Sequence, residues 1–157
     1  MKTNPNLVTW SATYSVGIKL IDDQHKELLN LVNDMYNHVN NDDEEAEKAY
    51  FQGVIRQAVD YVKLHFSTEE KIMKRTNFQG YNGHKKAHDS FILSVVKAIK
   101  EFEEGKRVPL ISFTHFLKDW ILTHIAIMDK QYFEHLMKIA TRKANGKLIV
   151  TQAAIAF

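Results

Sequence analysis

Four segments of the chain repeat apolar residues at the spacing of an amphipathic α-helix, and only short polar stretches separate them. The segments start near Asp22, near Asp42 or Asp43, after the turn 77–83 and at Pro109. Asn40-Asn41 ends the first segment and Gly105 ends the third. Successive helices with short connections pack side by side in alternating directions. The pattern therefore predicts an all-α fold, an up-down-up-down four-helix bundle.

The whole chain, 1–157, is expected to form one domain with three parts. An N-terminal arm, 1–20, precedes a bundle of about 21–143, and a short tail, 144–157, follows it. Trp10 is expected to pack the arm onto the bundle. A chain of 157 residues is long enough to bury a core without covalent cross-links.

Composition restricts both the partners and the metal ligands that the chain can use. The net charge is +2 with no basic stripe, so no nucleic-acid partner is expected. No apolar run reaches the roughly 20 residues that cross a bilayer. Met1–Lys19 also lacks the apolar core of a signal peptide, so we expect a cytoplasmic protein without membrane insertion. Cysteine is absent, which leaves only nitrogen and oxygen ligands for any metal.

Metal-ligand residue types interrupt the buried stripe of every predicted helix. These residues are His25 in the first helix, His65 and Glu69 in the second, His84 and His88 in the third, and His124 and Asp129 in the fourth. Pairs four residues apart share one face of a helix. Because an unpaired buried charge costs several kcal/mol, a metal cluster is an economical way to satisfy all of them.

Each of these motifs also has an ordinary explanation when taken alone. Histidines four residues apart occur by chance on exposed faces, and His65 with Glu69 could form a surface pair. Glu70 is expected to be a solvated residue of that kind, and His25 alone could be a core histidine bonded to a carbonyl. The coincidence on four helices favours the metal. The remaining histidines, His38, His115 and His135, are expected to be surface or packing residues.

The ordered set of motifs resembles the hemerythrin family, in particular its bacterial branch. The motifs are Asp23-Gln24-His25-Lys26-Glu27-Leu28-Leu29, His65-Phe66-Ser67-Thr68-Glu69, His84-Lys85-Lys86-Ala87-His88 and His124-Ile125-Ala126-Ile127-Met128-Asp129. The resemblance spans roughly Trp10 to Leu136. It implies two non-haem iron ions joined by an oxo or hydroxo bridge. It further implies that His25 and His65 bind one iron, that His84, His88 and His124 bind the other, and that Glu69 and Asp129 bridge them.

The resemblance also implies a function, which is reversible dioxygen binding for storage, delivery or sensing, without enzymatic turnover. The implied ligand set leaves one coordination position open, on the iron with two histidines. Dioxygen is then the expected partner, and an unidentified oxygen-consuming protein is a candidate recipient. The alternative is a di-iron enzyme on the same scaffold, with peroxidase, nitric-oxide-handling or ferroxidase activity. An iron-donating repair protein would be expected to carry a cysteine-containing region.

Apolar residues next to the predicted ligands are expected to line the open position. They are Leu28, Phe66, Trp120, Ile121 and Ile125. An apolar wall would exclude water and slow autoxidation, although the same residues would also suit an ordinary core. Tyr132 follows Asp129 by three residues and is expected either to contact a ligand or to serve in aromatic packing.

The spacing of His124 and Asp129 predicts a local departure from helical geometry. Five residues at 3.6 residues per turn leave two side chains about 140° apart around a regular helix. A single π-type turn would bring Asp129 back toward the core, and such turns are frequent at functional sites. The alternative is a regular helix with Met128 facing inward.

Overall fold

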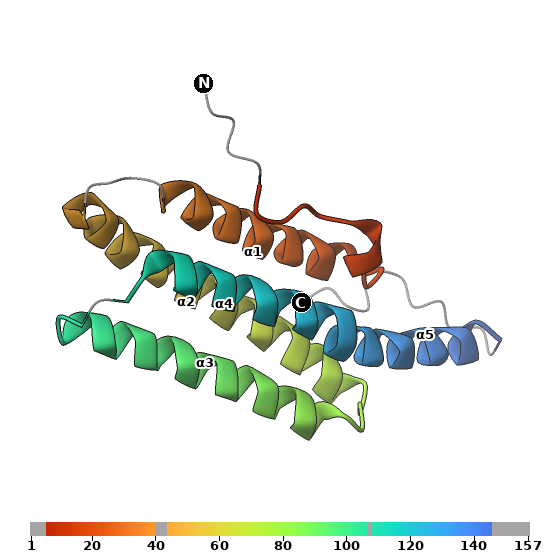
Figure 1. The fold of residues 1–157 in the computed structure, drawn as a ribbon. Coiled ribbons are helices and arrows are strands. Elements are labelled where there is room, and N and C mark those ends of the chain that lie inside the picture. The colour runs from red at the N-terminus through yellow and green to blue at the C-terminus, as the bar shows by residue number, and fades with distance from the viewer. Residues whose placement is uncertain (1–5, 40–43, 107, 146–157) are drawn as a thin grey trace.

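The computed structural model describes residues 6–39, 44–106 and 108–145, and these are almost entirely helical (Figure 1). The elements are η1 (Ala12–Tyr14), α1 (Lys19–His38), α2 (Glu44–Arg75), α3 (Tyr81–Glu103), α4 (Leu110–Thr123), η2 (His124–Asp129) and α5 (Lys130–Asn145). The π-helix η2 joins α4 to α5 without interruption, so these three elements form one long helix. The predicted four-helix bundle is confirmed.

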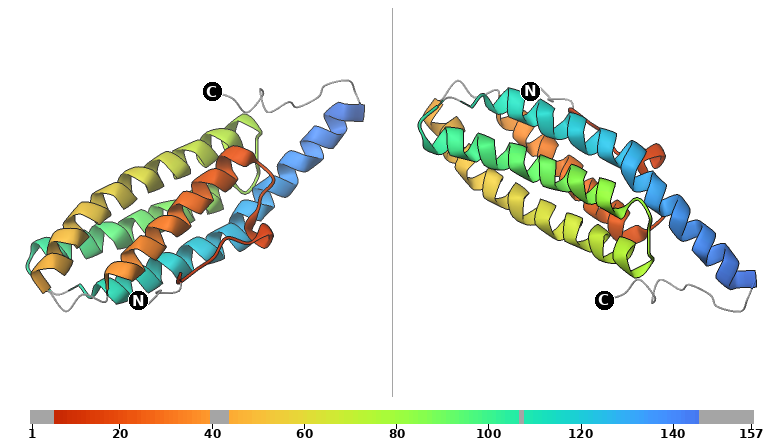
Figure 2. Two further views of the ribbon diagram at one scale, coloured as in Figure 1. Left: turned by 90° about the horizontal axis from the view of Figure 1, so that it is seen from above. Right: turned by 90° about the horizontal axis from the view of Figure 1, so that it is seen from below.

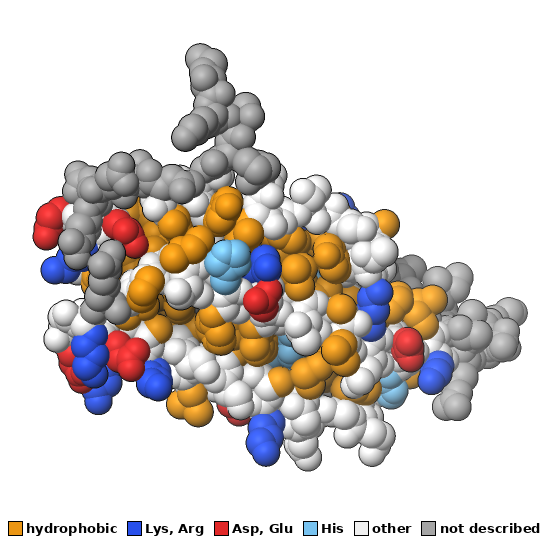
Figure 3. Space-filling model, viewed as in Figure 1, with side chains coloured by type: hydrophobic (Ala, Val, Ile, Leu, Met, Phe, Trp, Pro, Cys, Tyr) orange, Lys and Arg blue, Asp and Glu red, His pale blue; other side chains and the backbone are white. Residues whose placement is uncertain are grey.

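The four long helices lie side by side, and α5 projects beyond the others at one end of the bundle (Figure 2). On the face shown in Figure 3, Lys and Arg side chains lie among Asp and Glu, with hydrophobic side chains between them. None of the helices in the described part of the chain is long and apolar enough to span a membrane.

Among the described residues, two apolar clusters form the core. The larger one fills most of the bundle and includes Leu28, Phe66, Phe91, Ile121 and Ile125. The smaller one consists of Val16, Ile18, Ile21, Ile72, Met73 and Tyr132. Along α1 the buried His25 stands between Ile21 of one cluster and Leu28 of the other. The buried polar residues therefore lie where the two apolar clusters meet.

The N-terminal arm is fastened to the bundle by polar and aromatic contacts. The amide of Val8 donates to Oδ1 of Asn33 over 3.0 Å, and Nδ2 of Asn33 donates to the Val8 carbonyl over 2.8 Å. Trp10 packs against the larger core cluster, as predicted, and its ring centroid lies 6.5 Å from that of His25. The arm therefore covers one side of the buried polar residues.

The helix ends differ from the predicted ones by a few residues. α1 starts at Lys19, before the predicted Asp22, and the Asp22 carboxylate accepts from the Val16 amide over 2.8 Å. Asp22 therefore ties the arm to the first turn of α1. Gly83 lies inside α3, and Pro109 precedes α4 as its N-cap. The predicted helix end at Asn40-Asn41, the predicted helix start near Asp42 or Asp43, and tail residues 146–157 lie outside the described residues.

Candidate metal centre

All of the predicted ligands are buried, and they converge from all four long helices. His25 comes from α1, His65 and Glu69 from α2, His84 and His88 from α3, and His124 and Asp129 from η2. The most exposed of them, His124, retains only 5% of its accessible surface. A layer with this many buried imidazoles and carboxylates is costly unless its members satisfy one another or share a cation.

The ligand atoms divide into two groups that could each hold a metal ion. One group consists of Glu69, His84, His88 and His124, and the other of His25, His65, Glu69 and Asp129. Within each group, the candidate ligand atoms lie within 4.8 Å of one another. The histidines fall into the same sets of three and two that the family resemblance implies.

The three-histidine group has the spacing of donors around a single ion. The Nε2 atoms of His84 and His88 lie 3.1 Å apart, and Nε2 of His124 lies 3.0 Å from each of them. Hydrogen bonds cannot satisfy three mutually adjacent imidazole nitrogens, because each neutral ring carries a single proton. Donors at right angles around an ion, at the about 2.1 Å typical of imidazole ligation, lie about 3.0 Å apart. The observed spacing therefore fits an octahedral cation.

Glu69 connects the two groups through its two carboxylate oxygens. Its Oε2 lies 3.4 Å from Nε2 of His84 and 3.2 Å from Nε2 of His88. Its Oε1 lies 3.6 Å from Nε2 of His65 and 3.8 Å from Nε2 of His25. One oxygen therefore faces each group, which is the arrangement that a bridging carboxylate requires.

Asp129 connects the groups in the same way from the opposite helix. Its Oδ1 lies 3.1 Å from Nε2 of His124 and 3.3 Å from Nε2 of His84. Its Oδ2 lies 3.1 Å from Nε2 of His25. The two carboxylates therefore span the same pair of positions.

Several buried atoms of the centre make no hydrogen bond of good geometry. They are Nδ1 and Nε2 of His25, Oε2 of Glu69, and Oδ1 and Oδ2 of Asp129. Four of these five atoms point at the positions that the two groups surround, and an unpaired buried carboxylate oxygen is costly. Nitrogen and carboxylate ligands suit iron and other first-row transition metals. The residues present therefore fit a pair of such cations.

The carboxylates and imidazoles of the centre shift one another's pKa values. Against the effect of burial, the surrounding histidines lower the pKa of Glu69 to about 2 and that of Asp129 well below its ordinary value. Burial also favours a neutral His84, but the adjacent carboxylates of Asp129 and Glu69 outweigh it and raise the pKa of His84 to about 9. Burial lowers the pKa of His65 to about 4. Two anions therefore share the site with a proton on His84.

The predicted π-type turn is present and accounts for the position of Asp129. η2 spans His124–Asp129 as a π-helix, and Asp129 is fully buried whereas Met128 is only half-buried. The wider turn rotates Asp129 onto the face that His124 occupies. The alternative, a regular helix with Met128 facing inward, is wrong.

Within the described part of the chain, Tyr132, Gln24 and Glu70 contact the candidate ligands by hydrogen bonds. The Tyr132 hydroxyl donates to Oε1 of Glu69 over 3.1 Å. Of the two roles predicted for Tyr132, the structure therefore shows contact with a candidate ligand. Oε1 of Gln24 lies 3.0 Å from Nδ1 of His65, and Oε1 of Glu70 lies 3.1 Å from Nδ1 of His88. The expectation that Glu70 is merely solvated is wrong, because packing of α2 against α3 aims it at His88. The position of Gln24, directly before His25, was the only sequence signal for its role.

The predicted pocket residues occupy two different places. Phe66 stacks on His88 with ring centroids 3.7 Å apart, and Trp120 stacks on His124 at 4.4 Å. These two rings therefore cover the three-histidine group. Leu28 and Ile121 instead line an apolar cavity, and Ile125 is buried in the larger core cluster.

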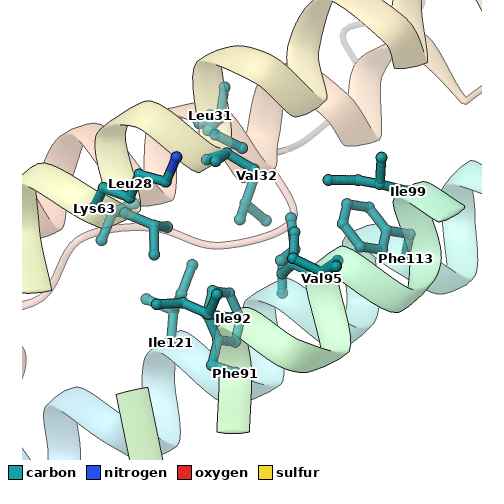
Figure 4. A pocket seen from close by; sticks show the side chains of 15 residues that line it. Leu28, Leu31, Val32, Lys63, Phe91, Ile92, Val95, Ile99, Phe113 and Ile121 are labelled. Atoms are coloured by element: carbon teal, nitrogen blue, oxygen red, sulfur yellow. The ribbon is translucent and has the colours of Figure 1, made fainter. Parts of the chain in front are cut away.

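That cavity lies about one helical turn away from the candidate ligands. It has a volume of about 120 Å³ and is bounded by side chains of α1, α2, α3 and α4 (Figure 4). Each helix contributes a lining residue three positions from one of its candidate ligands: Leu28 from His25, Val62 from His65, Phe91 from His88 and Ile121 from His124. On the side of the cavity, each long helix therefore places an apolar side chain next to its candidate ligand.

The other three histidines contact residues away from the centre. The His38 ring stacks on Tyr50 with centroids 3.7 Å apart. The His115 ring meets Tyr36 edge to face at 6.4 Å, and Nε2 of His135 lies 2.8 Å from the Thr76 carbonyl. Their contacts are those of packing residues.

Comparisons with known proteins agree with this architecture. Residues 16–136 match the family described as "Hemerythrin HHE cation binding domain". The chain is 28% identical over 127 residues to a bacteriohemerythrin of Methylococcus capsulatus, covering 80% of this chain and 94% of that one. It is 32% identical over 142 residues to a bacteriohemerythrin of Pseudomonas aeruginosa, covering 90% and 86%. A crystal structure of wild-type hemerythrin superimposes with a TM-score of 0.75 at 28% identity, covering 83% of this chain and 98% of that one. The chain belongs to the hemerythrin family.

Proposed function

We propose that this protein binds dioxygen reversibly at a non-haem di-iron centre, for oxygen storage, delivery or sensing. The observation that carries the proposal is the pair of metal-capable groups joined by both oxygens of Glu69 and of Asp129. A pair of iron ions held by these groups would supply the chemistry, since reduced iron can take up dioxygen and release it again.

The side chains of the centre would divide the work between holding metal and orienting ligands. His25 and His65 would hold one iron, the remaining three histidines the other, and the two carboxylates would bridge them. Tyr132 would hold Glu69 in place through its hydroxyl, 3.1 Å from Oε1. The set contains more neutral imidazoles than anionic carboxylates. Di-iron oxygenases in carboxylate-rich bundles use four carboxylates and two histidines. A less anionic set stabilises high oxidation states less, which favours binding over turnover.

The apolar surroundings would protect bound dioxygen from water and protons. Phe66 and Trp120 cover the imidazoles of His88 and His124, and Leu28 and Ile121 face the adjoining cavity. Excluding water removes a route by which a reduced centre loses electrons irreversibly. We propose that Phe66 and Trp120 exclude water from the three-histidine group, and that Leu28, Ile121 and Ile125 exclude it from the apolar side of the centre.

Visible absorption spectroscopy tests the proposed function. The reduced, iron-loaded protein should gain a charge-transfer band in air, lose it under argon and regain it in air, over repeated cycles. The His38→Ala variant, altered at a histidine outside the centre, should behave identically. Irreversible oxidation or bleaching within one cycle would contradict the proposal and favour the enzymatic alternative, with peroxidase, nitric-oxide-handling or ferroxidase activity.

A further inference from the structure

Two candidate ligands, one in each metal-capable group, are hydrogen-bonded at Nδ1 to acceptors of different charge. In the two-histidine group, Nδ1 of His65 lies 3.0 Å from the amide oxygen of Gln24. In the three-histidine group, Nδ1 of His88 lies 3.1 Å from a carboxylate oxygen of Glu70. Both contacts leave Nε2 of the same ring free to face a metal position. The group that accepts from Nδ1 is therefore a neutral amide in the two-histidine group and an anionic carboxylate in the three-histidine group.

The orientation of Gln24 is set by a further contact. Its Nε2 faces Oγ1 of Thr68 at 3.5 Å, and the Thr68 hydroxyl donates to the Leu64 carbonyl over 2.8 Å. Because that hydroxyl proton is already used, Thr68 can only accept from the Gln24 amide. The Gln24 oxygen must then face His65, which places the imidazole proton on Nδ1 and the lone pair on Nε2.

Glu70 performs the same orienting task with a negative charge. Its side chain retains 21% of its accessible surface, whereas that of His88 retains none. A carboxylate that accepts from the outer nitrogen of an imidazole strengthens the inner nitrogen as a donor and raises its basicity. Phe66 stacks on the His88 ring 3.7 Å away and keeps the ring in the plane that both contacts require.

We propose that Glu70 is a positioning residue that makes the three-histidine half of the centre the more electron-donating one, while Gln24 keeps the two-histidine half neutral. The inference rests on the proposed function, because it assumes iron in both halves. It adds that the two irons differ through their outer partners as well as through their histidine number. The higher oxidation state of iron is then favoured in the three-histidine group, next to Glu70.

Substitutions that move charge without removing the acceptor test this directly. Glu70→Gln keeps an oxygen facing His88 and removes the charge. We expect it to lower the oxidised-to-reduced ratio of the iron-loaded protein at a fixed potential about tenfold, a shift of about 59 mV for a one-electron step. Gln24→Glu adds a charge beside His65 and should shift the potential in the opposite direction.

Asp89→Asn is the matched control. It removes the same charge one residue from His88, but Asp89 is exposed and pairs with Lys85 over 2.7 Å. It should shift the potential much less than Glu70→Gln does. Competition of the metal-free protein with a chelator for Fe(II) gives a second readout. Glu70→Gln should weaken binding about tenfold, since outer partners of metal-bound histidines contribute that much or more, and Asp89→Asn should not.

The outcomes separate this inference from the proposed function. Potential shifts of opposite sign in Glu70→Gln and Gln24→Glu, with Asp89→Asn near the parent, would support it. Equal shifts in Glu70→Gln and Asp89→Asn would overturn it while leaving an iron-loaded, oxygen-binding parent intact. A parent that takes up no iron would overturn the proposed function itself, and this inference with it. If Glu70→Gln does not fold, the Gln24→Glu variant tests the inference by itself. Its reduction potential should lie below that of the parent, and an unchanged or higher potential would refute the effect of charge.

Discussion

His124 and Asp129 are five residues apart in one helix, yet Nε2 of the first lies 3.1 Å from Oδ1 of the second. The π-helix His124–Asp129 makes this possible, because its wider turn absorbs one residue more than a regular α-helical turn does. The position of Asp129 therefore depends on the number of residues that separate it from His124, and this number can be changed by deletion or insertion.

Deleting Ile127 should convert the π-turn into a regular α-helical turn without removing the aspartate from the centre. Ile127 is 55% exposed, and its loss leaves His124 and Asp129 four residues apart, about 40° from alignment. Inserting an alanine after Ile127 should instead rotate Asp129 by about 100° away from the centre. We expect the deletion to retain iron and the insertion to lose it, as measured by metal analysis after desalting.

Ile127→Ala is the control for both length variants, since it changes an exposed side chain and leaves the spacing alone. Iron retained equally in the insertion and the deletion variants would mean that Asp129 is dispensable as a bridge.

Tyr132→Phe should destabilise the metal-free protein. The variant removes the hydroxyl that donates to Oε1 of the buried Glu69 over 3.1 Å and leaves the ring in place. A hydrogen bond to a charged group contributes about 1.5–3 kcal/mol, so we expect a loss of that size in the free energy of unfolding. Urea denaturation of the metal-free protein measures it. An unchanged midpoint and slope would show that water replaces the hydroxyl without cost.

Ile121→Ala should speed autoxidation of the reduced, iron-loaded protein. Ile121 is 4% exposed, lines the apolar cavity and lies three residues before His124. Its truncation admits water next to the ligands and should cost about 2–5 kcal/mol of stability. Ile99→Ala enlarges the same cavity farther from the ligands and serves as the comparison. Loss of absorbance in air gives both rates, and equal rates would show that Ile121 acts only as core.

Iron uptake should release a proton from His84. Burial lowers the pKa of His84, but the adjacent carboxylates of Asp129 and Glu69 have the larger effect and raise it from 6.5 to about 9. A histidine must be neutral to bind a metal, so Fe(II) affinity should rise with pH, by up to about tenfold per unit below pH 9. Anaerobic calorimetric titration in two buffers of different ionisation enthalpy measures the release. An affinity that is flat between pH 7 and 9 would contradict the assignment.

The same shift predicts how the stability of the metal-free protein depends on pH. Because the folded-state pKa of His84 lies above its ordinary value, the folded state binds the proton more tightly than the unfolded state. That contribution is fully present below about pH 6.5 and is lost as the pH rises through about 9. The free energy of unfolding of the metal-free protein should therefore decline over this range, and His84→Gln should flatten the decline in chemical denaturation. A parent whose stability is constant from pH 6.5 to 9 would contradict the shift.

Patterns within a single helix were enough to predict which residues converge in the structure. Residue types, helical periodicity and the five-residue spacing of His124 and Asp129 together indicated the convergent residues and the π-turn. Glu70 escaped prediction because its partner, His88, belongs to α3, and only the packing of α2 against α3 brings them within 3.1 Å. Phe66 shows the same limit, since it follows His65 in sequence but stacks on His88.

Helix boundaries were harder to predict, because an aspartate near a helix start can either mark that start or bind a neighbouring segment of the chain. In the sequence, Asp22 marks the predicted start of the first helix, yet its carboxylate accepts from the Val16 amide and from the Ser15 hydroxyl. Those contacts depend on where the N-terminal arm returns to the bundle, which no local pattern encodes. In the structure α1 starts at Lys19, and Asp22 lies in its first turn.

Metal analysis of the purified protein tests the central claim most directly, because the account requires a cation in each of the two groups that Glu69 and Asp129 join. We expect about two iron atoms per chain in the parent, a matching content in His135→Ala, and loss of iron in His25→Ala and in His124→Ala. One iron per chain, zinc in its place, or iron lost from His135→Ala would contradict the proposed di-iron centre.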